Sequence, residues 1–181
     1  MALHSERSLS DLLDELAAQT PAPGGGSSAA WATAIAAALT EMAARFTPGA
    51  SPERASELRV HALELAEREL SAYAPVLEAS RLPKDDPTRA ERLSNALSDA
   101  ADSPLEIART AAEVAELARE LAQNGNRTLE GDANTGAELA SAACRAAARL
   151  VEINLQRTPD DPRLVEARQL RTKNQELRTK N

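Results

Sequence analysis

Alanine is the residue that most constrains what this chain can fold into. It supplies 39 of the 181 residues, whereas the only aromatic residues are Trp31, Phe46 and Tyr73. Sheet proteins need β-branched and aromatic side chains on their pleated faces, and alanine is the strongest helix former. We therefore predict an all-α fold. Because a core of methyl groups buries little apolar area per residue, we also expect a homodimer.

Charge and the shortage of metal-binding side chains exclude several classes of function. The formal net charge of -7 disfavours nucleic acid and anionic lipid as the main ligand. Cys144, His4 and His61 are too few for a histidine or thiolate metal site, and a single cysteine forms no internal disulfide. The sequence begins without the apolar core of a signal peptide, and no apolar run is long enough to cross a bilayer. We expect a cytoplasmic protein that binds no metal, nucleic acid or membrane.

Prolines and apolar periodicity divide the chain into helices. A serine or aspartate precedes proline, as in an N-cap followed by the first helical residue, at 51–52, 86–87, 103–104 and 161–162. Periodicity adds helices at about 8–19, 27–46 and 132–157, and Pro75 should kink or divide the 52–80 segment. We predict one domain over 1–181, a compact bundle of six or seven helices. Its tail, from about 163 to 181, is expected to be an exposed helix.

The most informative segment for function is TPAPGGGSSAA at 20–30. Gly24, Gly25 and Gly26 remove side chains where a ligand can approach the backbone. Ser27 then opens an alanine-rich helix whose free N–H groups attract anions. The same residues also suit a flexible turn with a serine cap, because the segment matches neither a Walker loop nor a dinucleotide fingerprint.

Polar residues in three other segments are candidates for the same site. Glu69 and Tyr73 are four residues apart on one helical face, where a carboxylate can move a proton and a ring can stack on a flat ligand. Lys84 can pair with an anionic group. Taken singly, each is also an ordinary surface or core residue. The same two interpretations apply to three polar residues along the predicted 132–157 helix: Asn126 just before it, Asp132 at its start and Asn154 near its end.

These segments occur together and in an order that is typical of one enzyme family. The sequence resembles the cyclodeaminase/cyclohydrolase family, which includes formiminotetrahydrofolate cyclodeaminase and methenyltetrahydrofolate cyclohydrolase, over most of residues 8–155. The matching stretches are SLSDLLDELAAQTPAPGGGS, SAYAPVLEASRLPK, ERLSNALSDAADSPLEIA, GNRTLEGD and VEINL. Four positions depart from the usual pattern: Ala22 replaces a threonine, Glu69 an aspartate, Gly131 a serine and Leu150 an asparagine.

The resemblance implies a helical dimer that binds a one-carbon tetrahydrofolate in a polar cleft, with no cofactor beyond that folate. The cyclodeaminase closes the methenyl ring of the folate with loss of ammonia. The cyclohydrolase opens that ring with water to give 10-formyltetrahydrofolate. Both reactions need a group that takes a proton and returns it to a leaving nitrogen.

Our hypothesis is that Asp132 transfers this proton and that Glu69 assists. The glycine turn and Lys84 would hold polar or carboxylate parts of the folate. The other residues expected to line the binding site are Tyr73, Asn126 and Asn154. The sequence leaves open which reaction runs. It also leaves open a module that keeps the fold and binds folate without chemistry, and an unrelated helical scaffold.

Overall fold

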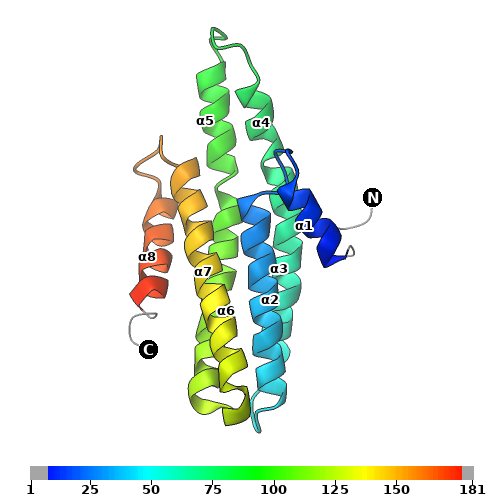
Figure 1. Cartoon of the computed structure of the whole chain (residues 1–181). Helices are drawn as coiled ribbons and strands as arrows, with labels where there is room; N and C mark the ends of the chain where they lie inside the picture. Colours follow the sequence, from blue (N-terminus) through cyan, green and yellow to red (C-terminus); the bar gives the residue numbers. More distant parts are fainter. Residues whose placement is uncertain (1–7, 177–181) are drawn as a thin grey trace.

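The computed structural model describes residues 8–176, and their regular structure is entirely helical (Figure 1). These residues form eight α-helices and one short 3-10 turn, η2, between α6 and α7. The bounds are α1 (Leu9–Ala17), α2 (Gly25–Arg45), α3 (Glu53–Ala72), α4 (Ala74–Ser80), α5 (Arg89–Asp99), α6 (Asp102–Asn124), η2 (Arg127–Leu129), α7 (Glu130–Asn154) and α8 (Pro162–Glu176). The all-α prediction is confirmed, and each predicted helix begins within two residues of its expected start. The 52–80 segment is divided into α3 and α4 just before Pro75.

Four long helices, α2, α3, α6 and α7, form the body of the bundle (Figure 1). Their buried faces are mostly alanine, with a few larger side chains such as Leu65, Ile107 and Val151. Small residues allow the helices to approach closely. At Gly136 of α7, an added Cβ would lie 3.2 Å from the carbonyl oxygen of Ala36 in α2. The alanine-rich composition therefore acts through close packing of helix backbones.

α8 packs against α6 and α7, so the prediction that the tail is an exposed helix is wrong for residues 163–176. Leu164, Ala167 and Asn174 share one face and are almost fully buried. Charged residues lie between these buried positions in the sequence, and for this reason the apolar periodicity of the segment was not recognised. The second LRTKN copy, at 177–181, lies outside the described residues.

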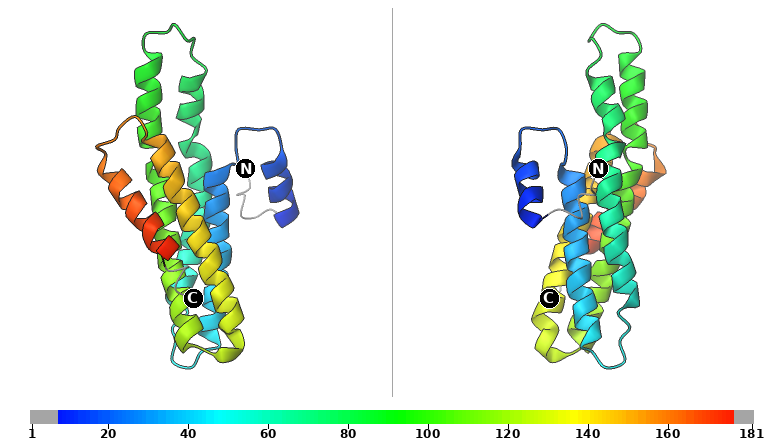
Figure 2. Two further views of the ribbon diagram at one scale, coloured as in Figure 1. Left: turned by 60° about the vertical axis from the view of Figure 1, so that its left-hand side comes forward. Right: turned by 90° about the vertical axis from the view of Figure 1, so that its right-hand side faces the viewer.

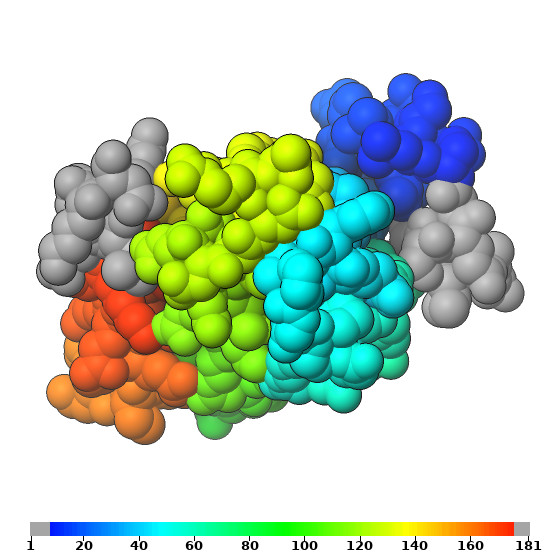
Figure 3. Space-filling view, turned by 90° about the horizontal axis from the view of Figure 1, so that it is seen from below, coloured from blue at the N-terminus to red at the C-terminus, as the bar shows by residue number. Residues whose placement is uncertain are grey.

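Two parts of the chain extend away from the body. α4 and α5 pack on each other around Val76, Ala96 and Ala100 and form a hairpin that extends past the ends of α2 and α7 (Figure 2). α1 stands apart from the bundle on the segment that leads to α2, and none of its residues is buried. Seen along the bundle from the end where the α2–α3 connection and the start of α7 are neighbours, α1 projects at the margin of the molecule (Figure 3).

No helix within residues 8–176 combines the length and the apolar character needed to cross a membrane. The cytoplasmic location stays a prediction.

Candidate functional site

A pocket of about 220 Å³ lies where the glycine turn leads into α2. Its walls come from the turn itself, from the end of α3 and from the last turn of α7. It brings together seven of the predicted site residues: Gly24, Gly25, Gly26, Ser27, Glu69, Tyr73 and Asn154. The remaining lining residues are Pro21, Ala22, Leu70, Leu150 and Ile153. Residues about 130 positions apart in the sequence thus form one site.

The glycine turn holds the start of α2 without a side-chain cap. Gly24 is the N-cap in an extended conformation, and no side chain accepts a hydrogen bond from the first N–H groups of the helix. Ser28 Oγ donates back to the carbonyl of Gly24 at 2.8 Å, and buried Ser27 Oγ donates to the carbonyl of Ala66 at 3.4 Å. The serines therefore fix the turn to α3, while the first backbone N–H groups of α2 have no intrahelical acceptor.

Glu69 of α3 lies directly over Gly26. A Cβ added to Gly26 would be 2.1 Å from Glu69 Oε1 and 2.6 Å from its Cγ, so any larger residue would displace this carboxyl group. Glu69 Oε2 and Ser103 Oγ of α6 are buried and form no hydrogen bond with any described residue. Burial raises the pKa of Glu69 above its ordinary value, and the neighbouring Ser103 side chain offsets part of the rise.

No cationic side chain contributes to the electrostatics of Glu69. A carboxyl group whose pKa is raised in this way can both give and take a proton closer to neutral pH. One turn further along, the ring of Tyr73 is 37% exposed and offers a stacking surface at the pocket mouth. Asn154 donates through Nδ2 to the carbonyl of Ala100 at 3.0 Å, which orients its amide. The pocket thus combines an acid/base group, a stacking ring and backbone donors.

The other predicted residues lie elsewhere in the chain. Asp132 is in the first turn of α7 and Asn154 is its last residue, so they are about 33 Å apart along the helix. Asp132 and Glu69 of the same chain are therefore far apart. Sequence spacing could not reveal this, because it indicates which face of a helix a residue occupies but not which residues of other helices lie near it. Lys84 is exposed in the α4–α5 connection, at the tip of the hairpin.

Asn126 has a structural role at the Asp132 end of the bundle. Its Oδ1 accepts from the backbone N–H of Thr128 at 3.0 Å and caps η2. Its Nδ2 donates to the carbonyl of Phe46 at 3.0 Å, and its own N–H donates to Thr47 Oγ1 at 3.1 Å. These bonds tie the α6–α7 connection to the end of α2 and occupy the polar atoms of the side chain.

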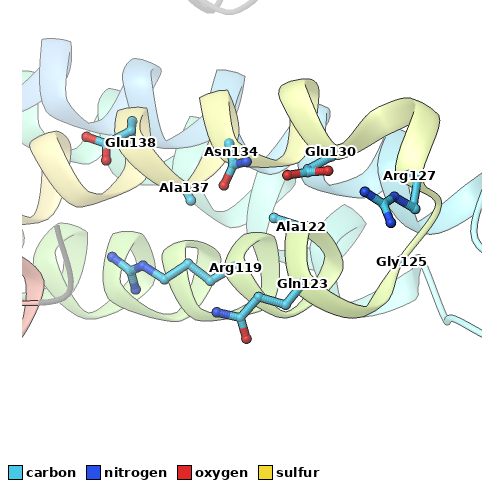
Figure 4. Close-up of a pocket in the computed structure, with 9 residues that line it drawn as sticks. All are labelled: Arg119, Ala122, Gln123, Gly125, Arg127, Glu130, Asn134, Ala137 and Glu138. Carbon is cyan, nitrogen blue, oxygen red and sulfur yellow. The ribbon is translucent and has the colours of Figure 1, made fainter. Parts of the chain in front are cut away.

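A larger pocket of about 650 Å³ lies between α6 and α7 at this end, and sequence reasoning missed it (Figure 4). Arg119 and Gln123 project from α6, while Glu130, Asn134 and Glu138 project from α7. Burial lowers the pKa of the Arg119 guanidinium, which donates to Ser141 and Asn174. With Arg127, the lining holds two arginines and two glutamates, so this pocket has no preference for one sign of ligand charge. Within residues 8–176 no three His, Cys, Asp or Glu side chains group as a metal site.

Known proteins resemble this chain along nearly its whole length. It is 33% identical to methenyltetrahydrofolate cyclohydrolase of Methylorubrum extorquens over 78% of this chain and 76% of that protein. It is 32% identical to mouse formimidoyltransferase-cyclodeaminase over 86% of this chain, which spans only 32% of that longer protein. The crystal structure of formiminotetrahydrofolate cyclodeaminase from Thermotoga maritima has the same fold, with a TM-score of 0.79, 27% identity, and coverage of 94% of this chain and 89% of that one. The family model described as formiminotransferase-cyclodeaminase matches residues 8–173. The resemblance seen in the sequence is confirmed, and the chain belongs to the formiminotransferase-cyclodeaminase family.

Proposed function

We propose that the protein converts the one-carbon group of a tetrahydrofolate in the pocket at the start of α2, with no cofactor beyond that folate. The reaction is either closure of the methenyl ring with loss of ammonia or hydrolysis of that ring. The observation that carries the proposal is Glu69, a half-buried carboxyl group in close contact with Gly26 and with no cationic partner. The names of the relatives support the substrate class, since both reactions occur among them.

One proton-shuttling carboxyl group serves either reaction. In hydrolysis, the Glu69 carboxylate takes a proton from water as the oxygen bonds to the methenyl carbon. It then returns the proton to the folate nitrogen as the carbon–nitrogen bond breaks, while the new hydroxyl group loses its own proton to solvent and becomes the formyl oxygen. In the deamination, Glu69 takes the proton of the attacking folate nitrogen and gives it to the departing amine. The raised pKa of Glu69 brings its two protonation states closer in energy, which this exchange requires.

The remaining pocket groups suit the binding of a flat, polar ring system. Tyr73 offers its ring for stacking, and Asn154 lies at the opposite wall with its amide held by the carbonyl of Ala100. The uncapped N–H groups at the start of α2 can donate to a carbonyl or carboxylate oxygen of the substrate. In this proposal Glu69 takes the proton-transfer role that the sequence hypothesis gave to Asp132, and the binding roles of Tyr73 and the glycine turn are kept.

We also propose that the protein acts as an antiparallel homodimer in which Asp132 completes the site of the partner subunit. α7 carries a stripe from half-buried Asp132 through exposed Leu139 and Ala146 to exposed Ile153, which lines the pocket. Leu139 is 36% exposed and Ile153 is 45% exposed. Neighbouring α2 adds Ile35, which is 51% exposed. Such an apolar face on a chain with a small-residue core favours a second copy as its cover.

The position of the two-fold axis follows from the ends of this stripe. Residue 142 is midway between Asp132 and Ile153, and the exposed residue there, Ala142, allows close helix approach. A two-fold axis at Ala142 pairs the two α7 helices antiparallel. It brings Asp132 of the partner subunit beside Ile153 and the pocket. The separation of about 33 Å within one chain becomes a short distance between chains.

The first test follows the absorbance of the methenyl chromophore with purified protein. Methenyltetrahydrofolate and formiminotetrahydrofolate are supplied separately. Enzyme-dependent loss of the first identifies a cyclohydrolase, and appearance of the chromophore from the second identifies a cyclodeaminase. Glu69→Gln should lower turnover by roughly 10²-fold or more. Glu64→Gln, an exposed position on the same helix, is the control and should retain turnover. No turnover of either folate, or full turnover by Glu69→Gln, contradicts the proposal.

A mixing experiment tests the shared site. Glu69→Gln and Asp132→Asn chains should each be inactive as homodimers. After exchange of subunits, half of the dimers are mixed and each mixed dimer has one intact site, so about a quarter of the wild-type activity should return. Full activity of Asp132→Asn alone, or no recovery on mixing, overturns the shared site and leaves the role of Glu69 standing.

A further inference from the structure

Ser103, in the first turn of α6, has a buried hydroxyl group that the fold leaves without a hydrogen bond. The residue is 4% exposed, and its Oγ has no partner among residues 8–176. The sequence pattern predicts that Ser103 caps α6. In the structure the helix already begins at Asp102, after Ala101, and no side chain caps it. The hydroxyl group of Ser103 is therefore not used for capping.

Every other buried hydroxyl group in the described part of the chain forms a hydrogen bond. These side chains are Ser27, Thr33, Thr40, Thr110 and Ser141. The three threonines donate to the carbonyl oxygen four residues earlier, at 2.8 to 2.9 Å. Ser27 donates to the carbonyl of Ala66, and Ser141 accepts from Arg119. Because a buried polar group without a partner costs stability, the exception at Ser103 needs an explanation.

The available partner of Ser103 is Glu69 of α3. Oε2 of Glu69 is also buried and has no hydrogen bond with any described residue. Burial raises the pKa of Glu69, and Ser103 is the side chain that opposes this rise. Glu69 lines the pocket at the start of α2, whereas Ser103 is not among the lining residues. Ser103 therefore lies beside the carboxyl group but outside the pocket, where it cannot contact a bound folate.

The two carboxyl oxygens of Glu69 have different surroundings. Oε1 is the oxygen nearer to the glycine turn of the pocket, since a Cβ added to Gly26 would lie 2.1 Å from it. Oε2 is the buried oxygen. A hydroxyl group can donate or accept, and donation from Ser103 to Oε2 would satisfy both unpaired atoms. A proton on Oε2 would instead leave the hydroxyl hydrogen of Ser103 without an acceptor in the described chain.

We propose that Ser103 is a positioning residue whose hydroxyl group donates to Oε2 of Glu69 and thereby keeps the transferred proton on Oε1, the oxygen that faces the pocket. Rotation about the terminal torsion of Glu69, which has a broad energy minimum, brings Oε2 to the hydroxyl group. Oε1 then takes the proton and returns it, and Ser103 itself exchanges no proton. This inference rests on the proposed function and adds to it the choice between the two oxygens.

Few ionisable groups face Glu69. Tyr73 lines the same pocket, and α2 contributes no charged residue to its lining. Asp132 of the partner subunit joins the site in the proposed dimer. The acidic residues in the first two turns of α6 and the last turn of α7 each pair with an arginine; they are Asp102, Glu106 and Glu152. All these groups are the same in the variants compared below, so a change in the titration of Glu69 reports on Ser103.

Titration of Glu69 without substrate is the direct test. The NMR signal of its carboxyl carbon, assigned by its loss in Glu69→Gln, is followed against pH in wild type and Ser103→Ala. Loss of the donor destabilises the carboxylate, so the midpoint should rise by about 1 pH unit. Thr110→Val removes a buried hydroxyl group that donates to the carbonyl of Glu106 on the same helix, and should leave the midpoint unchanged. Equal midpoints in wild type and Ser103→Ala overturn the inference and leave the role of Glu69 standing.

The pH profile of kcat/KM gives a second readout. Glu69 must be ionised to take a proton, so the acid limb should move to higher pH by about 1 unit in Ser103→Ala. On the plateau kcat should fall roughly tenfold, because the proton is no longer held on the oxygen that faces the pocket. Ser103→Thr keeps the hydroxyl group and should restore the limb, and Thr110→Val should match wild type. An unmoved limb in Ser103→Ala contradicts this inference alone, whereas full turnover by Glu69→Gln contradicts the proposed function with it.

Discussion

Each end of the bundle has a largely buried glutamate at α2, and the two glutamates differ in their charged neighbours and in the direction of their pKa shifts. Glu41, near the end of α2, is 8% exposed and pairs with Arg45 at 2.6 Å and Arg59 at 2.9 Å. These partners lower its pKa. Glu69, at the start of α2, has no cation and has a buried oxygen without a hydrogen bond, and burial raises its pKa. The fold pairs one carboxylate with two cations and leaves the other without one.

The amide side chains follow the same division. At the Glu41 end, Asn126 uses both its oxygen and its nitrogen to hold loops together. At the Glu69 end, Asn154 uses only its nitrogen among the described residues, and the N–H groups at the start of α2 have no side-chain cap. Unsatisfied polar groups inside a folded chain cost stability, so those at the Glu69 end support the proposal that a substrate supplies the missing partners there.

The largest effect is expected from a substitution that fills the space occupied by the Glu69 carboxyl group. Gly26→Ala should lower kcat by roughly 10²-fold, because its Cβ would displace the carboxyl group by more than 1 Å. Gly24→Ala is the matched control, since a Cβ there meets nothing within 4 Å and its backbone is extended. Steady-state kinetics on both variants, with circular dichroism to verify the fold, checks this. Equal losses from the two substitutions would mean that the turn needs glycine for its backbone alone.

A smaller effect is expected at the Asn126 end of the bundle, where a substitution should change stability and not turnover. Asn126→Ala removes the cap of η2 and the bond to Phe46, so the free energy of unfolding should fall by about 1–2 kcal/mol. Denaturant melts measure this. Turnover by the assembled protein at saturating folate should stay near wild type. A large loss of kcat without loss of stability would return Asn126 to the substrate-binding role that its motif position implies.

Sequence reasoning predicted the fold well because alanine content, proline positions and helical periodicity are local signals. It also predicted the pocket at the start of α2, where Gly26, Glu69 and Asn154 meet. It failed for α8 because Leu164 and Ala167 are separated by charged residues that made the segment look solvated. The Arg119 pocket was missed because its residues carry no recognisable motif and meet only when α6 and α7 pack.

The placement of Asp132 shows a different limit. Its motif position suggested proton transfer together with Glu69, but no local signal states that α3 and α7 run parallel, so that the end of α3 and the start of α7 lie at opposite ends of the bundle. The order of motifs in a chain is the same whether a site is built within one subunit or between two. Only the length of α7, which has Asp132 in its first turn and Asn154 as its last residue, makes a shared site a geometric possibility.

The pH dependence of stability also distinguishes Glu69 from Glu41. The expected effects are the smallest of those predicted. The folded-state pKa of Glu69 is raised, so below its ordinary pKa of 4.5 its ionisation does not lower the free energy of unfolding. As the pH rises above 4.5 the free energy of unfolding falls, until the pH exceeds the folded-state pKa. Glu69→Gln should therefore melt at a higher temperature than wild type at pH 7, on the order of 2 °C, and equal it below pH 4.5.

Glu41→Gln should show the opposite sign. Its folded-state pKa is lowered, so its contribution to stability is present above the ordinary pKa and is lost as the pH falls through the folded-state value. This variant should melt below wild type at pH 7, and the gap should close only in acid. Melting curves of both variants between pH 4 and 8 decide the matter. If both substitutions shift Tm in the same direction at pH 7, the two ends do not differ in the way that their ion pairs indicate, and the case for Glu69 as the reserved carboxylate fails.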